Sequence, residues 1–301
     1  MQNARKACFH LPGLFEFYEF YRVFLPLYAA HPEYFYEHCC ISSLYGAPAD
    51  CLWGGGRAGY GEADPREAFA LAREYGLSAR LTFSNSLLQP EHLQDARCNE
   101  LCRLAQQNGP VQSGVIVHSN LLADYLQKHY PGLYLVSSTT KVLTSFSAFR
   151  AETENPAFSY VVPDFRLNKA FAQLSALPQP LKDKTEFLCN ECCYIGCQRR
   201  KECYVEVSRR SLGLPDSGHR CGAPGAEEGY RFSKAMQSPA FISTEDIQKV
   251  YLPMGFSQFK IEGRSLGSAL ILEFLLHYLT RPEYQLTVRE EIYLENTLDL
   301  F

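Results

Sequence analysis

Short apolar runs that alternate with helical patterns constrain the fold of this chain more than any other feature. Each run has four to six residues and ends in polar residues, and helical patterns at 91–108, 121–130 and 267–279 follow some of them. This alternation is typical of parallel βα units. The seven runs that we predict to be strands are 41–44, 79–83, 114–117, 133–136, 158–162, 185–188 and 256–261.

Repeated βα units over 301 residues predict an α/β fold, a TIM-type (β/α)8 barrel that forms one domain over 1–301, irregular in places. A doubly wound open sheet is the alternative. No G-x-G-x-x-G follows an early strand, which disfavours a dinucleotide-binding version of it. The glycine-rich segment 50–61 matches neither phosphate-loop pattern.

Charge and hydropathy argue against a nucleic-acid-binding protein and against a membrane-spanning one. The net charge is −4, so the chain has no global basic field that would hold a nucleic acid. No apolar run reaches the roughly 18–20 residues that span a bilayer. The first residues lack the pattern of a signal peptide, so we expect a cytoplasmic protein.

The distribution of the 12 cysteines is uneven. In a reducing compartment, dense cysteines indicate metal binding or catalysis rather than disulfides. The cysteines outside the dense region lie near apolar residues, and we expect them in the core; they are Cys8, Cys39, Cys40, Cys51, Cys98 and Cys102. Half of the total falls within 33 residues, at Cys189, Cys192, Cys193, Cys197, Cys203 and Cys221.

The dense region begins after the sixth predicted strand and forms a cysteine-rich excursion over 189–234, rich in glycine and proline toward its end. A close group of thiols with one more distant thiol favours a [4Fe-4S] cluster. Zinc is the alternative, because Cys189 and Cys192 have structural-zinc spacing, although a second C-x-x-C pair is absent. The basic residues at 199–201 would lower thiol pKa values and balance an anionic centre.

Polar residues follow most of the predicted strands, and in a barrel such positions share one mouth. Arginine forks suit carboxylate or phosphate ligands, so we expect a small anionic or aromatic substrate there. The alternative for each residue is a structural role as a cap or in an ion pair, as for Asp164 with Arg166. The ring comprises Asn85, His118, Asn120, Lys141, Asp164, Arg166, Glu191, Glu262 and Arg264, with Arg57 after the early glycines; the predicted catalytic residues are Arg57, His118, Asp164, Arg166, Glu262 and Arg264.

Two segments resemble the collagenase-like peptidases, peptidase family U32. The segment 258–264 (QFKIEGR) is similar to their K-I-E-G-R signature, and 190–204 (NECCYIGCQRRKECY) to N-E-x-C-x-x-x-C-x-x-R in a divergent branch. The resemblance covers roughly 41–279. It implies a barrel-like fold with a [4Fe-4S] cluster on four cysteines. It also implies similarity to oxygen-independent hydroxylases that act on RNA bases or on a ubiquinone precursor, with prephenate as oxygen donor.

Carried onto this sequence, the resemblance makes Cys193 and Cys197 the first two ligands. Cys203, where the branch often has histidine, and Cys221 are the other candidates, and Cys189 or Cys192 could replace either one. The family's C-terminal RNA-modifying extension has no counterpart before residue 301, which with the acidic charge argues against an RNA substrate. We therefore expect a redox enzyme. The alternatives are a peptidase, and a non-catalytic cluster-bearing subunit with a paralogous partner. No acyl-transfer triad and no zinc-peptidase helix is readable.

Overall fold

The computed structural model describes residues 5–55 and 63–294 and has eight parallel strands. Their order in the sheet is β6-β5-β4-β3-β2-β1-β8-β7. A parallel bridge between Val161 and Thr185 joins the two edges, so the sheet curls into a nearly closed barrel. The predicted TIM-type fold is confirmed, and the open sheet is not formed. The strands are β1 (Ala7–Pro12), β2 (Cys39–Gly46), β3 (Ser78–Phe83), β4 (Gly114–Val117), β5 (Tyr134–Ser137), β6 (Tyr160–Val161), β7 (Glu186–Leu188) and β8 (Gln258–Lys260).

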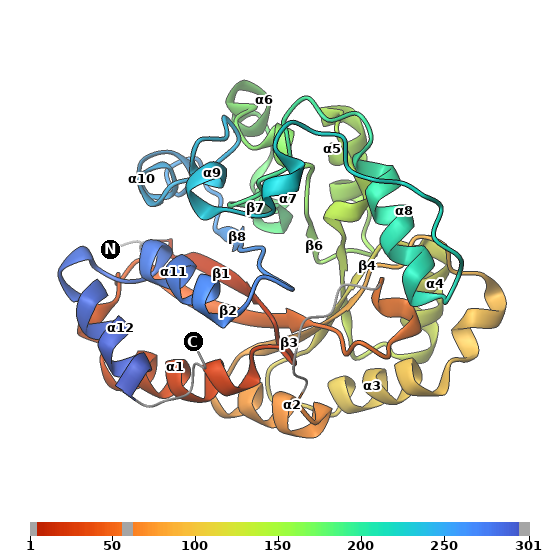
Figure 1. Ribbon diagram of the computed structural model, residues 1–301, viewed down its shortest axis with the longest axis horizontal. Coiled ribbons are helices and arrows are strands. Elements are labelled where there is room, and N and C mark those ends of the chain that lie inside the picture. The colour runs from red at the N-terminus through yellow and green to blue at the C-terminus, as the bar shows by residue number, and fades with distance from the viewer. Residues whose placement is uncertain (1–4, 56–62, 295–301) are drawn as a thin grey trace.

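Helices surround the barrel in chain order, as the colours of Figure 1 show. Along one side lie α1, α2 and α3, and α5, α6 and α7 lie on the opposite side (Figure 1). None of the helices in the described ranges is long and apolar enough to cross a membrane. The helices are α1 (Tyr18–Ala30), α2 (Pro65–Glu74), α3 (Ala96–Gln106), α4 (Asn120–His129), α5 (Phe146–Glu154), α6 (Phe171–Ser175), α7 (Gln179–Lys184), α8 (Arg200–Ser211), α9 (Phe232–Met236), α10 (Thr244–Asp246), α11 (Ser268–Tyr278) and α12 (Gln285–Leu294).

Local sequence signals explain where several helices begin. The side chains of Asp64, Asp95, Ser119 and Ser145 each accept a hydrogen bond from a backbone N–H in the first turn of the following helix. Such caps satisfy donors that have no partner within the helix. All four capping residues lie in the loops that follow the carboxyl ends of β2, β3, β4 and β5, so they fix where each of these helices begins.

The strands separate two layers of side chains. In β4, Val115 and Val117 pack outward against the helices, whereas Ile116 points into the barrel with Val136 and Leu188. This alternation is expected for parallel strands covered on both faces. The barrel interior also contains the charged side chains of Arg80 on β3, Glu186 on β7 and Lys260 on β8, with His10 of β1 beside them.

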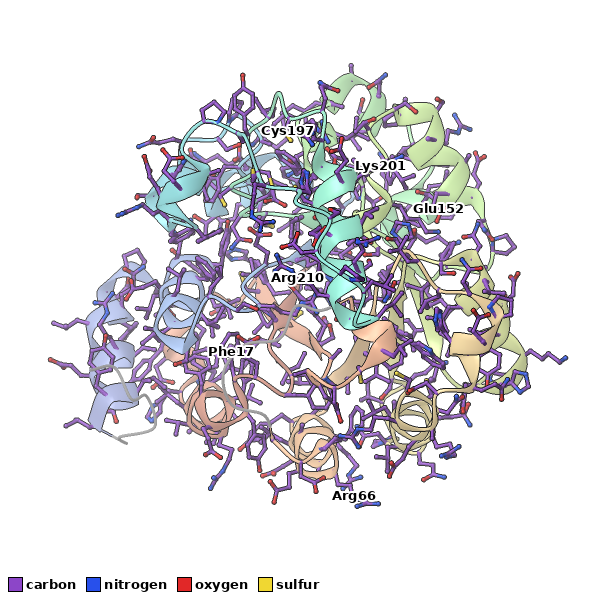
Figure 2. The ribbon with its side chains drawn as sticks, turned by 45° about the vertical axis from the view of Figure 1, so that its right-hand side comes forward. Phe17, Arg66, Glu152, Cys197, Lys201 and Arg210 are labelled. Carbon is purple, nitrogen blue, oxygen red and sulfur yellow. The ribbon has the colours of Figure 1, made fainter. Side chains whose placement is uncertain are left out.

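The cysteine-rich excursion follows the seventh strand of the barrel, β7, because the structure has an additional first strand, β1. The excursion contains α8, which extends across the carboxyl ends of the strands. It contacts the segments Leu52–Gly54 after β2 and Thr139–Lys141 after β5. Figure 2 shows this helix from the side, with Lys201 near its beginning and Arg210 near its end.

Candidate functional site

A cavity of about 260 Å³ lies at the carboxyl ends of the strands, beneath α8. Strand-end residues, the cysteine-rich segment and the residues after β8 all contribute to its wall. This is where TIM-type barrels hold their active sites. Its polar and sulfur-bearing lining includes Tyr45, Thr82, Ser84, Ser138, Thr139, Thr140, Glu191, Cys192, Cys193, Arg200, Cys203, Tyr230, Lys260, Glu262 and Arg264.

The lysine at the end of β8 lies on the floor of the cavity. Lys260 Nζ is 3.8 Å from the ring centroid of Tyr45 and 3.2 Å from Glu186 Oε1. Burial lowers the pKa of Lys260 to about 8, although Glu186 opposes this shift. Lys260 therefore places a positive charge at the cavity floor at neutral pH, where an anionic ligand would meet it.

The two segments that carry the family resemblance meet at the cavity. The amide of Asn190 bonds with the backbone of Glu262 in both directions, at 2.8 Å and 3.1 Å. The Tyr230 hydroxyl donates to the Asn190 carbonyl oxygen at 2.9 Å. These bonds hold Glu262 and Arg264 beside the cysteine-rich segment, although the two segments are about seventy residues apart in the sequence.

Gly263 lies between these two functional candidates because the backbone approaches the barrel closely there. A Cβ atom at this position would lie 2.2 Å from Ile271 Cδ1 and 2.9 Å from Pro12 Cγ. A larger residue would therefore require either Ile271 and Pro12 or the segment with Glu262 and Arg264 to shift.

A buried ion-pair network supports the cysteine-rich segment. Asp164 binds Arg166 at 2.5 Å and Arg200 at 2.9 Å, and Arg200 also pairs with Glu191. Burial alone would raise the pKa of Asp164, but the hydrogen bond from Arg166 and the charge of Arg200 outweigh it and lower the pKa. Asp164 is therefore ionised and anchors both arginines.

The same network fixes the backbone that carries two of the predicted ligands. Arg166 Nη1 donates to the Cys197 carbonyl oxygen at 2.7 Å, and the Cys193 N–H donates to Glu191 Oε1 at 3.0 Å. We predicted Asp164 and Arg166 to be catalytic. In the structure they hold the backbone of the cysteine-rich segment in place.

The predicted sulfur ligands line two neighbouring cavities. Cys193 and Cys203 line the central cavity. Cys197, Cys203 and Cys221 line a second cavity of about 330 Å³ together with His219. Cys203 thus lies between the two cavities. Figure 2 shows Cys197 at the end of the molecule where α8 begins.

The donor set fits a metal centre in its chemistry. Three thiols and an imidazole surround the second cavity, and soft sulfur ligands favour iron–sulfur clusters or zinc. Within the described residues, Glu191, Cys192 and Glu262 are the group of three whose ligand atoms lie within 4.8 Å of one another. No three of the predicted ligands Cys193, Cys197, Cys203 and Cys221 have sulfur atoms that close together. Glu191 is already engaged by Arg200 and the Cys193 N–H.

The other sulfur atoms lie apart from this region. Cys189 is fully buried beside β7, and burial raises its pKa. Cys39, Cys51, Cys98 and Cys102 are buried in the core, whereas Cys8 and Cys40 are half-buried with their sulfur atoms 3.3 Å apart.

Other predicted ring residues are dispersed. His118 lies in a separate groove with Lys141 and bonds to Thr140 Oγ1 at 2.9 Å. Asn85 is fully buried and donates to the backbone carbonyl oxygens of Leu52 and Ser208, which fastens α8 to the barrel. Arg57 lies outside the described residues.

Three residues of the site were not predicted individually. Lys260 is two positions before Glu262, so strand alternation within QFKIEGR could have placed both on the inner face. His219 lies two positions before Cys221, a spacing that joins it to the cysteine cluster. The role of Arg200 had no local signal, because its partner Asp164 is 36 residues away.

Comparisons with known proteins show a similarity of fold. No family model and no curated protein matches the sequence. Among solved structures, the chain is similar to the U32 peptidase Mk0906, with a TM-score of 0.51 and 13% sequence identity. The superposition covers 87% of this chain and 94% of that one. At this identity the likeness concerns the fold, so the chain has a U32-like barrel.

Proposed function

We propose that this protein is an iron–sulfur protein and a redox enzyme that acts on a small anionic or aromatic substrate. Cys193, Cys197, Cys203 and Cys221 would hold the [4Fe-4S] cluster, and zinc is the alternative metal. The observation that carries the proposal is the position of Cys203, which lines both the cavity with Cys197 and Cys221 and the cavity at the barrel mouth. A centre bound there would lie directly beside a bound substrate.

The cavity at the mouth supports an anionic substrate. Lys260 and Arg264 bring positive charge to its wall, and Ser138, Thr139 and Thr140 offer hydroxyl groups. Carboxylates bind well to such a combination of guanidinium and hydroxyl donors. The resemblance to oxygen-independent hydroxylases fits this chemistry, with a carboxylic acid such as prephenate as one ligand.

The cluster would supply electron transfer or Lewis acidity at the cavity wall. The residues of this chain would hold the substrate carboxylate at Arg264 and Lys260, orient its ring over the apolar floor formed by Ile116 and Leu188, and exclude water beneath α8. Glu262 would accept or return a proton at the cavity edge.

The metal content of the protein tests the proposal. We expect anaerobically purified protein to contain iron and acid-labile sulfide and to absorb visible light. Cys197→Ser and Cys203→Ser should each lose most of the iron. Cys40→Ser, which makes the same change near the amino end of β2, is the control and should keep it. Colourless protein without iron under these conditions would overturn the proposal.

Binding of prephenate tests the substrate class. Arg264→Ala should weaken binding, measured calorimetrically, by at least about tenfold, since a charge-assisted hydrogen bond contributes roughly 1.5–3 kcal/mol. Arg150→Ala, on the exposed surface of α5, should leave binding unchanged. Equal affinity in the Arg264 variant would reject this role.

A hydrolase is the second candidate, because a thiol and an imidazole lie close together. Cys203 Sγ is 3.2 Å from His219 Nε2, within the range of a nucleophile and its base. Peptide cleavage that continues after removal of all metal, and that Cys203→Ser abolishes, would favour this candidate.

A further inference from the structure

Two cysteines outside both cavities lie side by side at the amino end of the barrel. Cys8 is near the beginning of β1 and Cys40 is near the beginning of β2, and the two residues are register partners in the parallel sheet. Their sulfur atoms are 3.3 Å apart. Both residues are half-buried and keep some contact with solvent. The central cavity lies at the opposite ends of these strands, so the pair is separate from the proposed metal site.

The backbone permits a disulfide bond between these two residues. Adjacent strands lie about 4.7–4.9 Å apart, and the Cα atoms of disulfide-bonded cysteines usually lie about 4.4–6.8 Å apart. Register partners on β1 and β2 fall within this range. The sulfur atoms would have to approach by about 1.3 Å to reach a bond length of about 2.05 Å. Rotation of the two side chains about their Cα–Cβ bonds can supply this approach.

The surroundings favour a thiolate at one of the two sulfur atoms. The pKa of Cys8 is lowered to about 6, chiefly by the hydrogen bond that its sulfur accepts from Cys40 and against the opposing effect of burial. Ser42 and the positive charges of Lys6 and Arg5 act in the same direction as Cys40. The same hydrogen bond raises the pKa of Cys40.

The pair therefore holds one thiolate and one thiol at neutral pH. The Lys6 carbonyl oxygen lies 3.8 Å from Cys8 Sγ, which is too far to hold a thiol proton firmly on that sulfur. The thiolate is the form of cysteine that attacks a disulfide, and a second thiol beside it can complete the exchange.

We infer that Cys8 and Cys40 are a redox-active dithiol that reacts with small disulfides and closes to an intramolecular disulfide bond. The Cys8 thiolate attacks one sulfur of glutathione disulfide, which breaks that S–S bond and releases one glutathione thiolate. The Cys40 thiol gives its proton to the released thiolate, and its sulfur then attacks Cys8 Sγ. The second glutathione leaves as a thiolate and takes a proton from water. Two protein thiols are thus oxidised, and one glutathione disulfide is reduced.

A metal site would not account for this pair as well. In the part of the chain that the structure describes, no third cysteine, histidine or carboxylate joins Cys8 and Cys40 in a group with metal-ligand spacing. Structural zinc needs four ligands. The groups that lower the pKa of Cys8 are a thiol, a hydroxyl and two cations, which stabilise a thiolate but do not complete a ligand set.

The residue before Cys40 provides a matched control. Cys39 belongs to the apolar cluster on the outer face of the sheet, because successive side chains of a strand face opposite sides. Its sulfur lies 3.7 Å from the Tyr278 carbonyl oxygen, and burial raises the pKa of Cys39 to about 12. Cys39 should therefore remain an unreactive thiol although it is adjacent to Cys40 in the sequence.

The test treats the full chain, purified anaerobically, with glutathione disulfide, then alkylates the remaining thiols and analyses tryptic peptides by mass spectrometry. In the wild type, the Cys8 peptide should be linked to the peptide that contains Cys39, Cys40 and Cys51, and dithiothreitol should remove the link. Cys39→Ala should keep the linked peptide, whereas Cys40→Ala should lose it. Cys40→Ser should accumulate a glutathionyl group on Cys8, because no second thiol is present to release it.

Two results would overturn the inference. One is wild-type Cys8 that stays fully open to alkylation after treatment with an excess of glutathione disulfide. The other is a linked peptide that persists in Cys40→Ala, because another thiol would then be the partner of Cys8. Circular dichroism establishes that each variant is folded, and the wild-type result is decisive without them. Iron content does not enter this test, so its outcome is separate from that of the proposed function.

Discussion

At the scale of single residues, His10 shows how strongly the barrel interior controls ionisation. Its Nδ1 lies 2.8 Å from Ser43 Oγ, and its Nε2 lies 2.9 Å from Gln258 Oε1 and 3.5 Å from Glu186 Oε2. Burial, followed by the positive charge of Arg80, lowers the pKa of His10 to about 3, although Glu186 acts in the opposite direction. His10 is therefore neutral in the folded protein across the physiological range.

We predict that His10 contributes to loss of stability in acid. The unfolded chain binds a proton at this residue below about pH 6.5, but the folded protein does not until about pH 3. The free energy of unfolding should therefore decrease as the pH falls through this window, by up to about 1.4 kcal/mol per pH unit from this residue. His10→Gln should show a smaller decrease between pH 6 and pH 4.5, as measured by urea unfolding.

The surface substitution His31→Gln is the matched control for this measurement, because it removes a histidine from an exposed position. If the His10 and His31 variants lost stability in acid at the same rate as the wild type, the buried histidine would not be neutral as argued.

At the scale of elements, α8 connects the barrel to the cysteine-rich segment. Arg200 begins the helix and pairs with Asp164 and Glu191, and Cys203 follows within one turn. Toward its end, Ser208 accepts hydrogen bonds from the Ser86 N–H and, through its carbonyl oxygen, from Asn85. One helix therefore fixes both the arginine network and Cys203, one of the proposed ligands.

Replacement of Arg200 at the beginning of α8 should lower the free energy of unfolding. Arg200→Met leaves Asp164 with one partner and Glu191 without its buried cation, so we expect a loss of about 3 kcal/mol in urea unfolding. Arg200→Lys should recover only part of the lost stability. It restores the positive charge, but an ammonium group cannot reproduce the forked contact with two carboxylates. The variants should also be cleaved faster by protease within 193–199.

Arg210→Met is the control on the same helix, because Arg210 is exposed near its end (Figure 2). It should change stability by no more than about 0.5 kcal/mol. If Arg200→Met behaved like this control, the network would not support the cysteine segment.

The elements show which parts of the fold local sequence could predict. All seven predicted strands coincide with β2 to β8, because each is an apolar run between polar ends. The first strand, β1, was missed, since its sequence ACFHLP mixes His10 and Pro12 with apolar residues. Glu262 and Arg264 were predicted from their position after the last strand, and both line the cavity. In contrast, the roles of Asp164, Arg166 and Asn85 depend on the path of α8, which no local pattern describes.

At the scale of the whole molecule, one carboxylate connects opposite walls of the barrel. Glu186 on β7 binds Arg80 on β3 at 2.6 Å and Lys260 on β8 at 3.2 Å. In the strand order, β3 and β7 lie four positions apart in a ring of eight. Burial alone would raise the pKa of Glu186, but Arg80, His10 and Lys260 hold it well below its ordinary value.

The strength of this interior connection can be measured by removing its single negative charge. Glu186→Gln leaves the side chains of Arg80 and Lys260 buried without a counter-ion, so the free energy of unfolding in urea should fall by about 3–5 kcal/mol. Glu154→Gln makes the same change in the exposed pair with Arg150 and should cost no more than about 0.5 kcal/mol. Because Lys260 also lines the cavity, its lost partner should lower the pKa of its amine further and weaken prephenate binding above pH 7. Equal stability of the two variants would mean that the barrel closes without help from its interior charges.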